Sequence, residues 1–289
     1  MTQERQFRVG TRCQLLPYLI GLPLGLSRKR AKDLLRYSLI SVTDKERVRH
    51  DTELEPGDTV TIAARAAGHQ SPLEHLGLKI VHLDDAIIVV DKPAGLLSMG
   101  SDREKERTAH RILNEHLKTS TKSLRQQAFI VHRLDRDTSG LMMFARSESI
   151  QAALRQNWKK VQKKYLAVVE GVPASVRGTL KDQLIETGAL KVRRVEHGGA
   201  LAITHYRVIA RRADRSLLEL TLETGRKNQI RVQLAAVGCP IVGDRKYGAK
   251  TDPVRRLALH SSELDFIHPI THAQVKFRSG LPAKLKCLI

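Results

Sequence analysis

The stretch His132-Arg133-Leu134-Asp135-Arg136-Asp137-Thr138-Ser139-Gly140 decides how this chain is interpreted. It places two carboxylates and three basic side chains close together, ahead of a turn sequence and the apolar run 141–145. Catalytic groups are often held on a loop of this kind, fixed by a rigid core strand. A salt-bridged surface loop is the alternative. It fits less well, because the charge is dense and the loop leads into the core and not along an exposed helix.

The overall charge predicts a polyanionic partner. Lys and Arg number 50 and Asp and Glu 30, a net charge of +20, which exceeds what solubility requires. We expect nucleic acid; an acidic membrane surface and a merely solvating positive surface are the alternatives. With 289 residues, 41% of them hydrophobic, the chain is predicted to be globular, with one large or two modest domains.

Several functional classes lack the residues they need. Cys13, Cys239 and Cys287 are far apart and form no C-x-x-C pair, so we expect no disulfide framework, no zinc site and a cytoplasmic protein. The twelve histidines lack metal-ligand spacing, and no phosphate-binding glycine loop occurs. The longest apolar stretch, residues 15–26, is too short and too interrupted to span a membrane.

Residues 11–65 are predicted to form a small separate module. A helix capped by Ser27 would carry Arg28, Lys29 and Arg30 on its polar face, and short strands would follow at 39–42 and 60–63. The arrangement resembles the alpha-L RNA-binding module, which implies that these three cations bind RNA phosphates. The apolar stretch 15–24 departs from the usual first helix of that module. Residues 66–75 are expected to be a linker.

Residues 76–289 are predicted to form an α+β domain with a mixed, mainly antiparallel sheet, because β-branched runs outnumber helical segments. Lys92 precedes a proline and is therefore extended at a strand end, where it is available to a phosphate or is a plain turn lysine. From Ser147 an apolar stripe continues at helical spacing to Tyr165. The opposite face is cationic and includes Lys159 and Lys163, which we expect to contact RNA.

The same residues suggest a chemistry. An aspartate such as Asp135 acts as nucleophile or base only when it is ionised and positioned, and a nearby arginine favours the ionised form. A base in folded RNA must leave the stack before it reacts. Tyr165 would be a natural stacking partner for such a base, although a core tyrosine is the default interpretation.

Residues 132–141 are similar to the signature of the RluA-type pseudouridine synthases. Segments 91–95, 163–171 and 224–235 resemble further conserved segments of that family, in the same order. The resemblance implies the pseudouridine synthase catalytic fold and isomerisation of uridine to pseudouridine in ribosomal or transfer RNA, by a monomer without cofactor or metal. It identifies Asp135 as the catalytic carboxylate, Tyr165 as packing on the base and Arg231 as the partner of Asp135. It also implies that Arg133, Arg136 and Arg226 contact RNA.

Two alternatives remain open. The first is a catalytically inactive RNA-binding or ribosome-assembly protein with the same fold. The second is a hydrolytic glycosidase, which needs a second carboxylate. Asp137 is the nearest, but we expect it to hold the turn with Thr138 and Ser139. The chain departs from the family at Lys227-Asn228 and at Gln233, and we expect these changes to affect RNA contacts.

Overall fold

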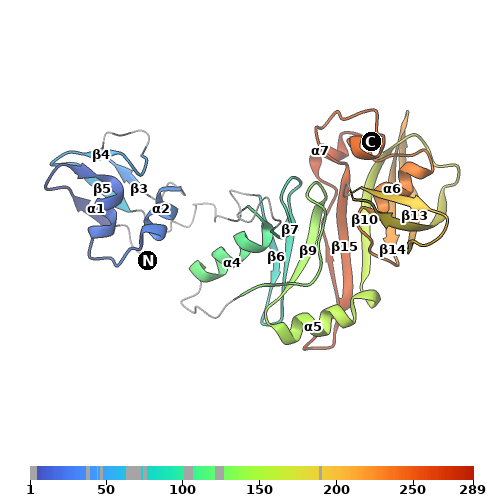
Figure 1. Cartoon of the computed structure of the whole chain (residues 1–289), viewed down its shortest axis with the longest axis horizontal. Coiled ribbons are helices and arrows are strands. Elements are labelled where there is room, and N and C mark those ends of the chain that lie inside the picture. The colour runs from blue at the N-terminus through green and yellow to red at the C-terminus, as the bar shows by residue number, and fades with distance from the viewer. Residues whose placement is uncertain are drawn as a thin grey trace. The chain divides into compact units, whose positions relative to one another are not determined.

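The computed structural model describes residues 5–36, 40–43, 45, 48–62, 73, 77–100, 107–120, 127–188 and 191–289. The chain divides into two compact units, Met1–Pro72 and Leu73–Ile289 (Figure 1). The division falls within the predicted linker at 66–75, most of which lies outside the described residues.

The first unit is a small α/β structure. Its strands are β1 (Arg5–Arg8), β2 (Cys13–Gln14), β3 (Ile40–Val42), β4 (Glu53–Leu54) and β5 (Thr59–Ile62). β1 and β3 flank β5 in one sheet, β2 pairs with β4, and helices α1 (Leu15–Gly21) and α2 (Arg28–Arg36) contact each other. β1 begins before the predicted start of the module at residue 11.

The apolar stretch 15–24 contains a helix, although its sequence departs from the usual first helix of the alpha-L module. Residues 15–21 form α1, because Pro17 lies in the first turn, where a missing N–H costs no helical hydrogen bond. Leu15, Leu16 and Leu19 are buried and anchor this helix in the core of the unit.

The second unit is built on one large sheet (Figure 1). Among the described residues it has eleven strands, in the order β12-β11-β13-β14-β10-β15-β9-β7-β6, with β8 paired to β9 and β16 to β15. The strands are β6 (Lys79–Leu83), β7 (Ile87–Lys92), β8 (Phe129–Ile130), β9 (Ser139–Ala145), β10 (Gln162–Glu170), β11 (Arg177–Glu186), β12 (Val192–Val195), β13 (Ala200–Arg212), β14 (Arg215–Leu222), β15 (Leu259–Ile267) and β16 (Gln274–Arg278). Of the described pairings between the named strands of this sheet, only β9 with β15 is parallel. The predicted mixed, mainly antiparallel sheet is confirmed.

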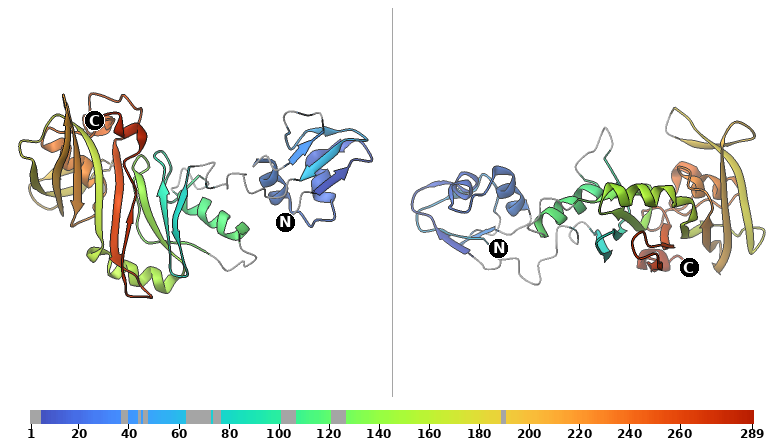
Figure 2. Two further views of the ribbon diagram at one scale, coloured as in Figure 1. Left: turned by 180° about the vertical axis from the view of Figure 1, so that it is seen from behind. Right: turned by 90° about the horizontal axis from the view of Figure 1, so that it is seen from below.

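Short helices accompany this sheet (Figure 2). They are α4 (Ala109–Ser120), α5 (Glu148–Gln156), η1 (Trp158–Lys160), α6 (Gln229–Ala236), η2 (Arg245–Tyr247) and α7 (Ala283–Lys286). α4 packs Ile112 and Leu113 against Met142 and Phe144 of β9, which is buried along its whole length. Strand β9 is therefore a rigid base for the loop that precedes it.

The helix that begins after Ser147 is shorter than predicted. The Ser147 hydroxyl accepts a hydrogen bond from the backbone N–H of Ile150, as its capping role requires, but α5 ends at Gln156. A 3₁₀ turn follows, and the chain then pairs with β14 and β15 as strand β10. The helical spacing of the apolar residues continues into β10 by chance, because pairing with β14 and β15 makes this segment a strand whatever its local pattern. Lys159 and Lys163 therefore do not share a helix face, and Tyr165 lies within β10.

Candidate active site

The loop 131–138 that carries Asp135 is held by hydrogen bonds to its backbone. The Ser98 hydroxyl donates to Leu134 O at 2.7 Å and accepts from Leu134 N at 3.0 Å. Arg136 O accepts from Gly95 N at 2.9 Å and from Lys92 Nζ at 3.0 Å. Because these bonds fix the residues on both sides of Asp135, the position of its carboxylate is set by the fold.

Gly140 is required where the loop enters β9. Its φ is +110°, and a Cβ there would lie 2.2 Å from the backbone oxygen of Ser261 on the parallel strand β15. No residue with a side chain fits this contact. The Thr-Ser-Gly turn thus brings the loop directly against β15.

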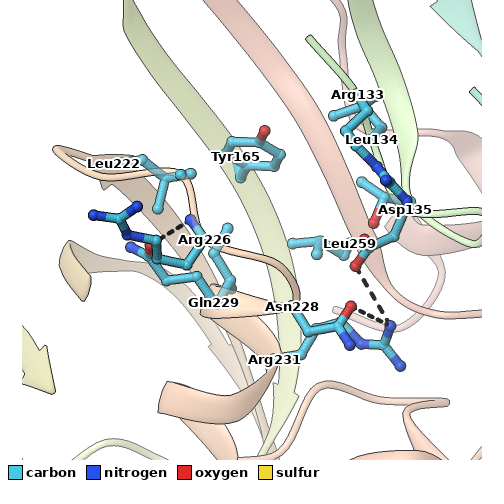
Figure 3. A pocket seen from close by; sticks show the side chains of 13 residues that line it. Arg133, Leu134, Asp135, Tyr165, Leu222, Arg226, Asn228, Gln229, Arg231 and Leu259 are labelled. Carbon is cyan, nitrogen blue, oxygen red and sulfur yellow. Dashed lines mark hydrogen bonds and ion pairs between the residues drawn. The ribbon is translucent and has the colours of Figure 1, made fainter. Parts of the chain in front are cut away.

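A pocket of about 90 Å³ lies beside the loop (Figure 3). It is bounded by the loop, β10, β15 and the segment that leads into α6. Its lining consists of Arg133, Leu134, Asp135, Thr138, Tyr165, Leu222, Gly225, Arg226, Asn228, Gln229, Ile230, Arg231 and Leu259. The three residues predicted to be catalytic, far apart in the sequence, therefore lie around one pocket. Ile230 is in its wall.

Asp135 and Arg231 point toward one another at this pocket (Figure 3). Arg231 Nη1 lies 3.5 Å from Asp135 Oδ2, a long contact between a buried guanidinium and a half-buried carboxylate. The shorter contacts of Arg231 are with Asp244, which it binds in a bidentate pair at 2.7 and 2.8 Å. Burial acts to lower the pKa of Arg231, but the hydrogen bonds and charge of Asp244, with the charge of Asp135, outweigh this and raise it.

Two further groups fix the guanidinium of Arg231. Asn228 has a left-handed backbone, with φ at 52°, and its Oδ1 accepts from Arg231 Nη1 at 3.2 Å. Its Nδ2 donates to the Tyr247 hydroxyl at 2.9 Å, and the Tyr247 ring centre lies 5.0 Å from Arg231 Cζ. The side chain that faces Asp135 is thus held on three sides by buried or ordered partners.

Tyr165 forms the other side of the pocket from Arg231 (Figure 3). Burial raises the pKa of Tyr165 to about 12, and the charge of Asp135 acts in the same direction. The phenol is therefore neutral at physiological pH. Leu222 and Leu259 provide apolar surface next to its ring. A flat aromatic ring between apolar walls, close to one carboxylate, suits a planar base with its sugar.

Residues 86–236 match the family model described as RNA pseudouridylate synthase. The chain belongs to this family. It is 32% identical to the uncharacterized RNA pseudouridine synthase YhcT of Bacillus subtilis, over 95% of this chain and 92% of the relative. It is also 32% identical to ribosomal large subunit pseudouridine synthase D of Zymomonas mobilis, over 93% and 90%. The human RNA pseudouridylate synthase domain containing 4 is a structural neighbour, with a TM-score of 0.61, 25% identity and coverage of 72% of this chain and 90% of that one.

This RNA pseudouridine synthase, an isomerase, brings only some of the predicted RNA-binding cations to the pocket. Arg133 and Arg226 are exposed and line it. Arg136 and Lys159 are exposed outside its lining. Arg28 is exposed in the other unit, and the side chains of Lys29 and Arg30 lie outside the described residues.

Two lysines predicted to contact RNA are buried instead. Lys92 has no exposed surface, and its Nζ donates to the carbonyl oxygens of Pro93, Leu96 and Arg136. Lys163 is 6% exposed and donates to Trp158 O at 3.2 Å. Their ammonium groups satisfy backbone oxygens, so neither reaches an RNA phosphate in this structure. Lys92 is a structural support for the Asp135 loop.

His132 is not one of the cations of the loop. It stacks on Trp158 with ring centres 4.4 Å apart, and its Nε2 accepts from the backbone N–H of Met143 at 2.9 Å. Burial lowers the pKa of His132 to about 3, so the ring is neutral. The loop therefore presents two cations, Arg133 and Arg136, and not three.

The departures from the family pattern have different environments. Gln233 is fully buried, where its Nε2 donates to Leu180 O, Asp182 Oδ2 and Ala202 O and its Oε1 accepts from Thr204 Oγ1. It supports the sheet and does not face RNA, contrary to expectation. Lys227 is paired with Glu186 at the surface. Asn228 is the departure that reaches the site, through Arg231.

Sequence reasoning missed the supports of the catalytic residues. Asp244 follows Gly243 in the sequence, and nothing in its spacing indicated a bond to Arg231. Ser98 gave no signal of its own, and Asn228 was noted only as a departure from the family pattern. In the described parts of the chain no group of three or more His, Cys, Asp or Glu is placed to hold a metal ion. No described helix is long and apolar enough to cross a membrane.

Proposed function

We propose that this pseudouridine synthase modifies uridine in the RNA of the large ribosomal subunit, with Asp135 as its catalytic carboxylate. The observation that carries the assignment of Asp135 is its place at the pocket: it is fixed through the backbone of its loop, paired with Arg231 and opposite Tyr165. No other acid lines the pocket among the described residues.

Relatives support the choice of RNA. The chain is 32 to 34% identical to proteins named ribosomal large subunit pseudouridine synthase D in Zymomonas mobilis and Xanthomonas campestris, and it spans 90% and 84% of their lengths. A ribosomal substrate agrees with the net charge of +20, which favours a large polyanion. It also agrees with the cytoplasmic location predicted from composition. We propose that the chain acts as a monomer.

The reaction balances within the substrate. The bond between C1′ of the ribose and N1 of the uracil breaks, the base turns, and C1′ bonds to C5. N1 gains a proton and C5 loses one, so no other reactant is consumed. Asp135 acts at C1′, either by attack or by assisting a sugar intermediate, and Arg231 orients its carboxylate.

The other pocket residues act on the base. We propose that Tyr165 packs on the uracil once it has left the RNA stack. With its pKa near 12, its phenol is a hydrogen-bond donor and a poor base at neutral pH. Arg133 and Arg226, at the exposed rim, would hold the phosphates on either side of the flipped nucleotide.

A hydrolytic glycosidase is less well supported. Such an enzyme needs a second carboxylate across the scissile bond. Asp137, the only candidate that the sequence offers close by, lines a different cavity, together with Lys92 and Arg256. Asp244 is already held by Arg231 in a bidentate pair.

The test is pseudouridine mapping of ribosomal and transfer RNA from cells with and without the chain. We expect one or a few uridines of the large-subunit RNA to lose modification and to regain it with the wild-type protein. Asp135→Asn should not restore it, although the purified variant should still bind the RNA. Asp137→Asn is the matched control and should restore it. A change confined to transfer RNA would refute the proposed target, and full activity of Asp135→Asn would refute the catalytic assignment.

A further inference from the structure

A second cavity lies behind the loop that carries Asp135. Leu259 of β15 lines the catalytic pocket, whereas the next residue, His260, lines a separate cavity of about 650 Å³. Successive side chains of a strand point to opposite faces, so the two spaces lie on opposite faces of the sheet. The right view of Figure 2 agrees, with α6 on one side of the strands and α7, which borders the cavity through Lys284, on the other.

Five side chains form a continuous hydrogen-bonded chain at this cavity. Arg256 Nη2 donates to Ser139 Oγ at 2.7 Å, and Ser139 Oγ lies 2.9 Å from His260 Nδ1. His260 Nε2 lies 3.0 Å from Ser279 Oγ, which donates to Asp91 Oδ2 at 2.5 Å. Ser139 is the first residue of β9 and directly follows the loop 131–138, so the network is attached to the strand end next to the Asp135 loop.

The carboxylate end of this chain fixes the proton on Nε2 of His260, and the guanidinium end allows Nδ1 to be an acceptor. A guanidinium only donates and a carboxylate only accepts. Ser139 accepts from Arg256, and its own hydrogen can point to Nδ1 of His260. Ser279 gives its hydrogen to Asp91 and therefore accepts from Nε2. A neutral His260 with its proton on Nε2 satisfies every bond of the chain and also gives the hydrogen of Ser139 an acceptor.

The surroundings of His260 favour that form. Its side chain is 1% exposed, and burial lowers its pKa, an effect that the charge of Arg256 strengthens and that of Asp91 opposes. A protonated ring would donate from Nδ1 as well, and the hydrogen of Ser139 would lose its acceptor. The neutral ring thus joins β7, the start of β9, β15 and the segment after β16 in one network.

We propose that His260 is a positioning residue for the reaction, which holds the Asp135 loop in place through Ser139 from the far face of the sheet. The proposal rests on the assigned role of Asp135. Backbone bonds to Ser98 and Lys92 hold residues 134 and 136 of the loop. The network holds residue 139, which directly follows the loop and lies four residues after Asp135. Loss of this network displaces the Asp135 carboxylate but leaves Arg133 and Arg226 at the exposed rim of the pocket in place.

The kinetic test uses the hydroxyl groups on either side of His260. Ser139→Ala and Ser279→Ala each break the network without adding bulk, and we expect kcat to fall about tenfold or more, with KM for RNA unchanged. Ser279 is half-buried, so Ser279→Thr keeps the hydroxyl and should restore kcat to near the wild-type value. A purely structural role would lower the thermal midpoint of unfolding and leave kcat of the folded protein unchanged.

A second measurement needs no variant. Nitrogen NMR of the histidine rings in the wild-type protein at neutral pH should show His260 protonated on Nε2 and bare on Nδ1. The opposite tautomer, a doubly protonated ring or equal kcat values for Ser279→Ala and Ser279→Thr would overturn the proposal. Inactive wild-type protein would refute the proposed function instead, since the tautomer is measured without substrate.

Discussion

At the scale of single residues, Arg231 depends on Asp244 more than on Asp135. The Asp244 side chain is 1% exposed and forms both short bonds to the guanidinium. Asp244→Asn keeps the shape but leaves a buried cation without its main counter-charge, so we expect the free energy of unfolding to fall by about 3 kcal/mol. Isomerisation should slow as Arg231 shifts. Urea unfolding and single-turnover kinetics measure the two effects.

Asp214 provides the control for that substitution, because its side chain is 78% exposed. Asp214→Asn should change the unfolding free energy by no more than about 0.5 kcal/mol. If Asp244→Asn is as stable as the wild type, the ion pair between Asp244 and Arg231 does not stabilise the fold as its geometry indicates.

Lys92 gives the fold a pH dependence. Burial lowers its pKa from 10.5 to about 7, so between these values the unfolded chain binds a proton that the folded chain does not. The free energy of unfolding therefore rises with pH in this window, by up to about 1.4 kcal/mol per pH unit, and this gain is lost as the pH falls through 7. Lys92→Met, which does not titrate, should lack the slope.

Urea unfolding at several pH values between 7 and 10.5 measures that slope. Lys79→Met removes an exposed lysine of β6 and should keep the wild-type behaviour. Parallel pH curves for the wild type and Lys92→Met would show that Lys92 does not titrate in this window.

At the scale of elements, the junction between the Asp135 loop and β9 depends on close contact with β15. Gly140→Ala places a methyl group 2.2 Å from Ser261 O, so β9 and β15 must separate. We expect a loss of about 3 kcal/mol or more in unfolding free energy, together with loss of activity. Denaturant unfolding and a pseudouridine assay measure these changes.

Gly95→Ala is the matched control for Gly140→Ala. Gly95 also has a positive φ, +84°, but nothing lies within 4 Å of an added Cβ. Only backbone strain of about 1 kcal/mol should result. Equal effects of the two substitutions would show that strain, and not the contact between strands, makes Gly140 necessary.

The elements also show what sequence can predict. The apolar run 141–145 indicated a buried strand correctly, because a strand covered on both faces has a continuous apolar sequence. The apolar stripe from Ile150 to Tyr165 predicted one continuous helix. This was wrong for the second half of the segment, because its pairing with β14 and β15 makes it a strand. The burial of Lys92 had no local signal, since the three carbonyls that bind it come from backbone turns. Asp135, Tyr165 and Arg231 were found through resemblance, and Asp244 required the folded chain.

At the scale of the whole molecule, the positive charge is unevenly divided. Residues 1–72 contain 12 of the 50 basic and 8 of the 30 acidic residues, so most of the net charge of +20 belongs to the unit with the catalytic pocket. Electrostatic attraction of RNA is therefore expected to come mainly from that unit. The first unit would add a few phosphate contacts and not the bulk of the affinity.

Those few contacts are predicted to come from the start of α2, which carries Arg28, Lys29 and Arg30. Changing all three to Gln should weaken RNA binding and reduce the slope of log K against log salt concentration by about 2, since each phosphate contact contributes about 0.7 on single-stranded RNA. The value of kcat at saturating RNA should not change, because Asp135 lies in the other unit.

Replacing Arg5, Arg8 and Arg49, exposed elsewhere in the first unit, removes the same charge and should alter the slope less. Deletion of residues 1–68 should reduce it at least as much as the α2 variant. A slope that is unaffected by the α2 substitutions would exclude this helix as an RNA contact and leave recognition to the catalytic unit.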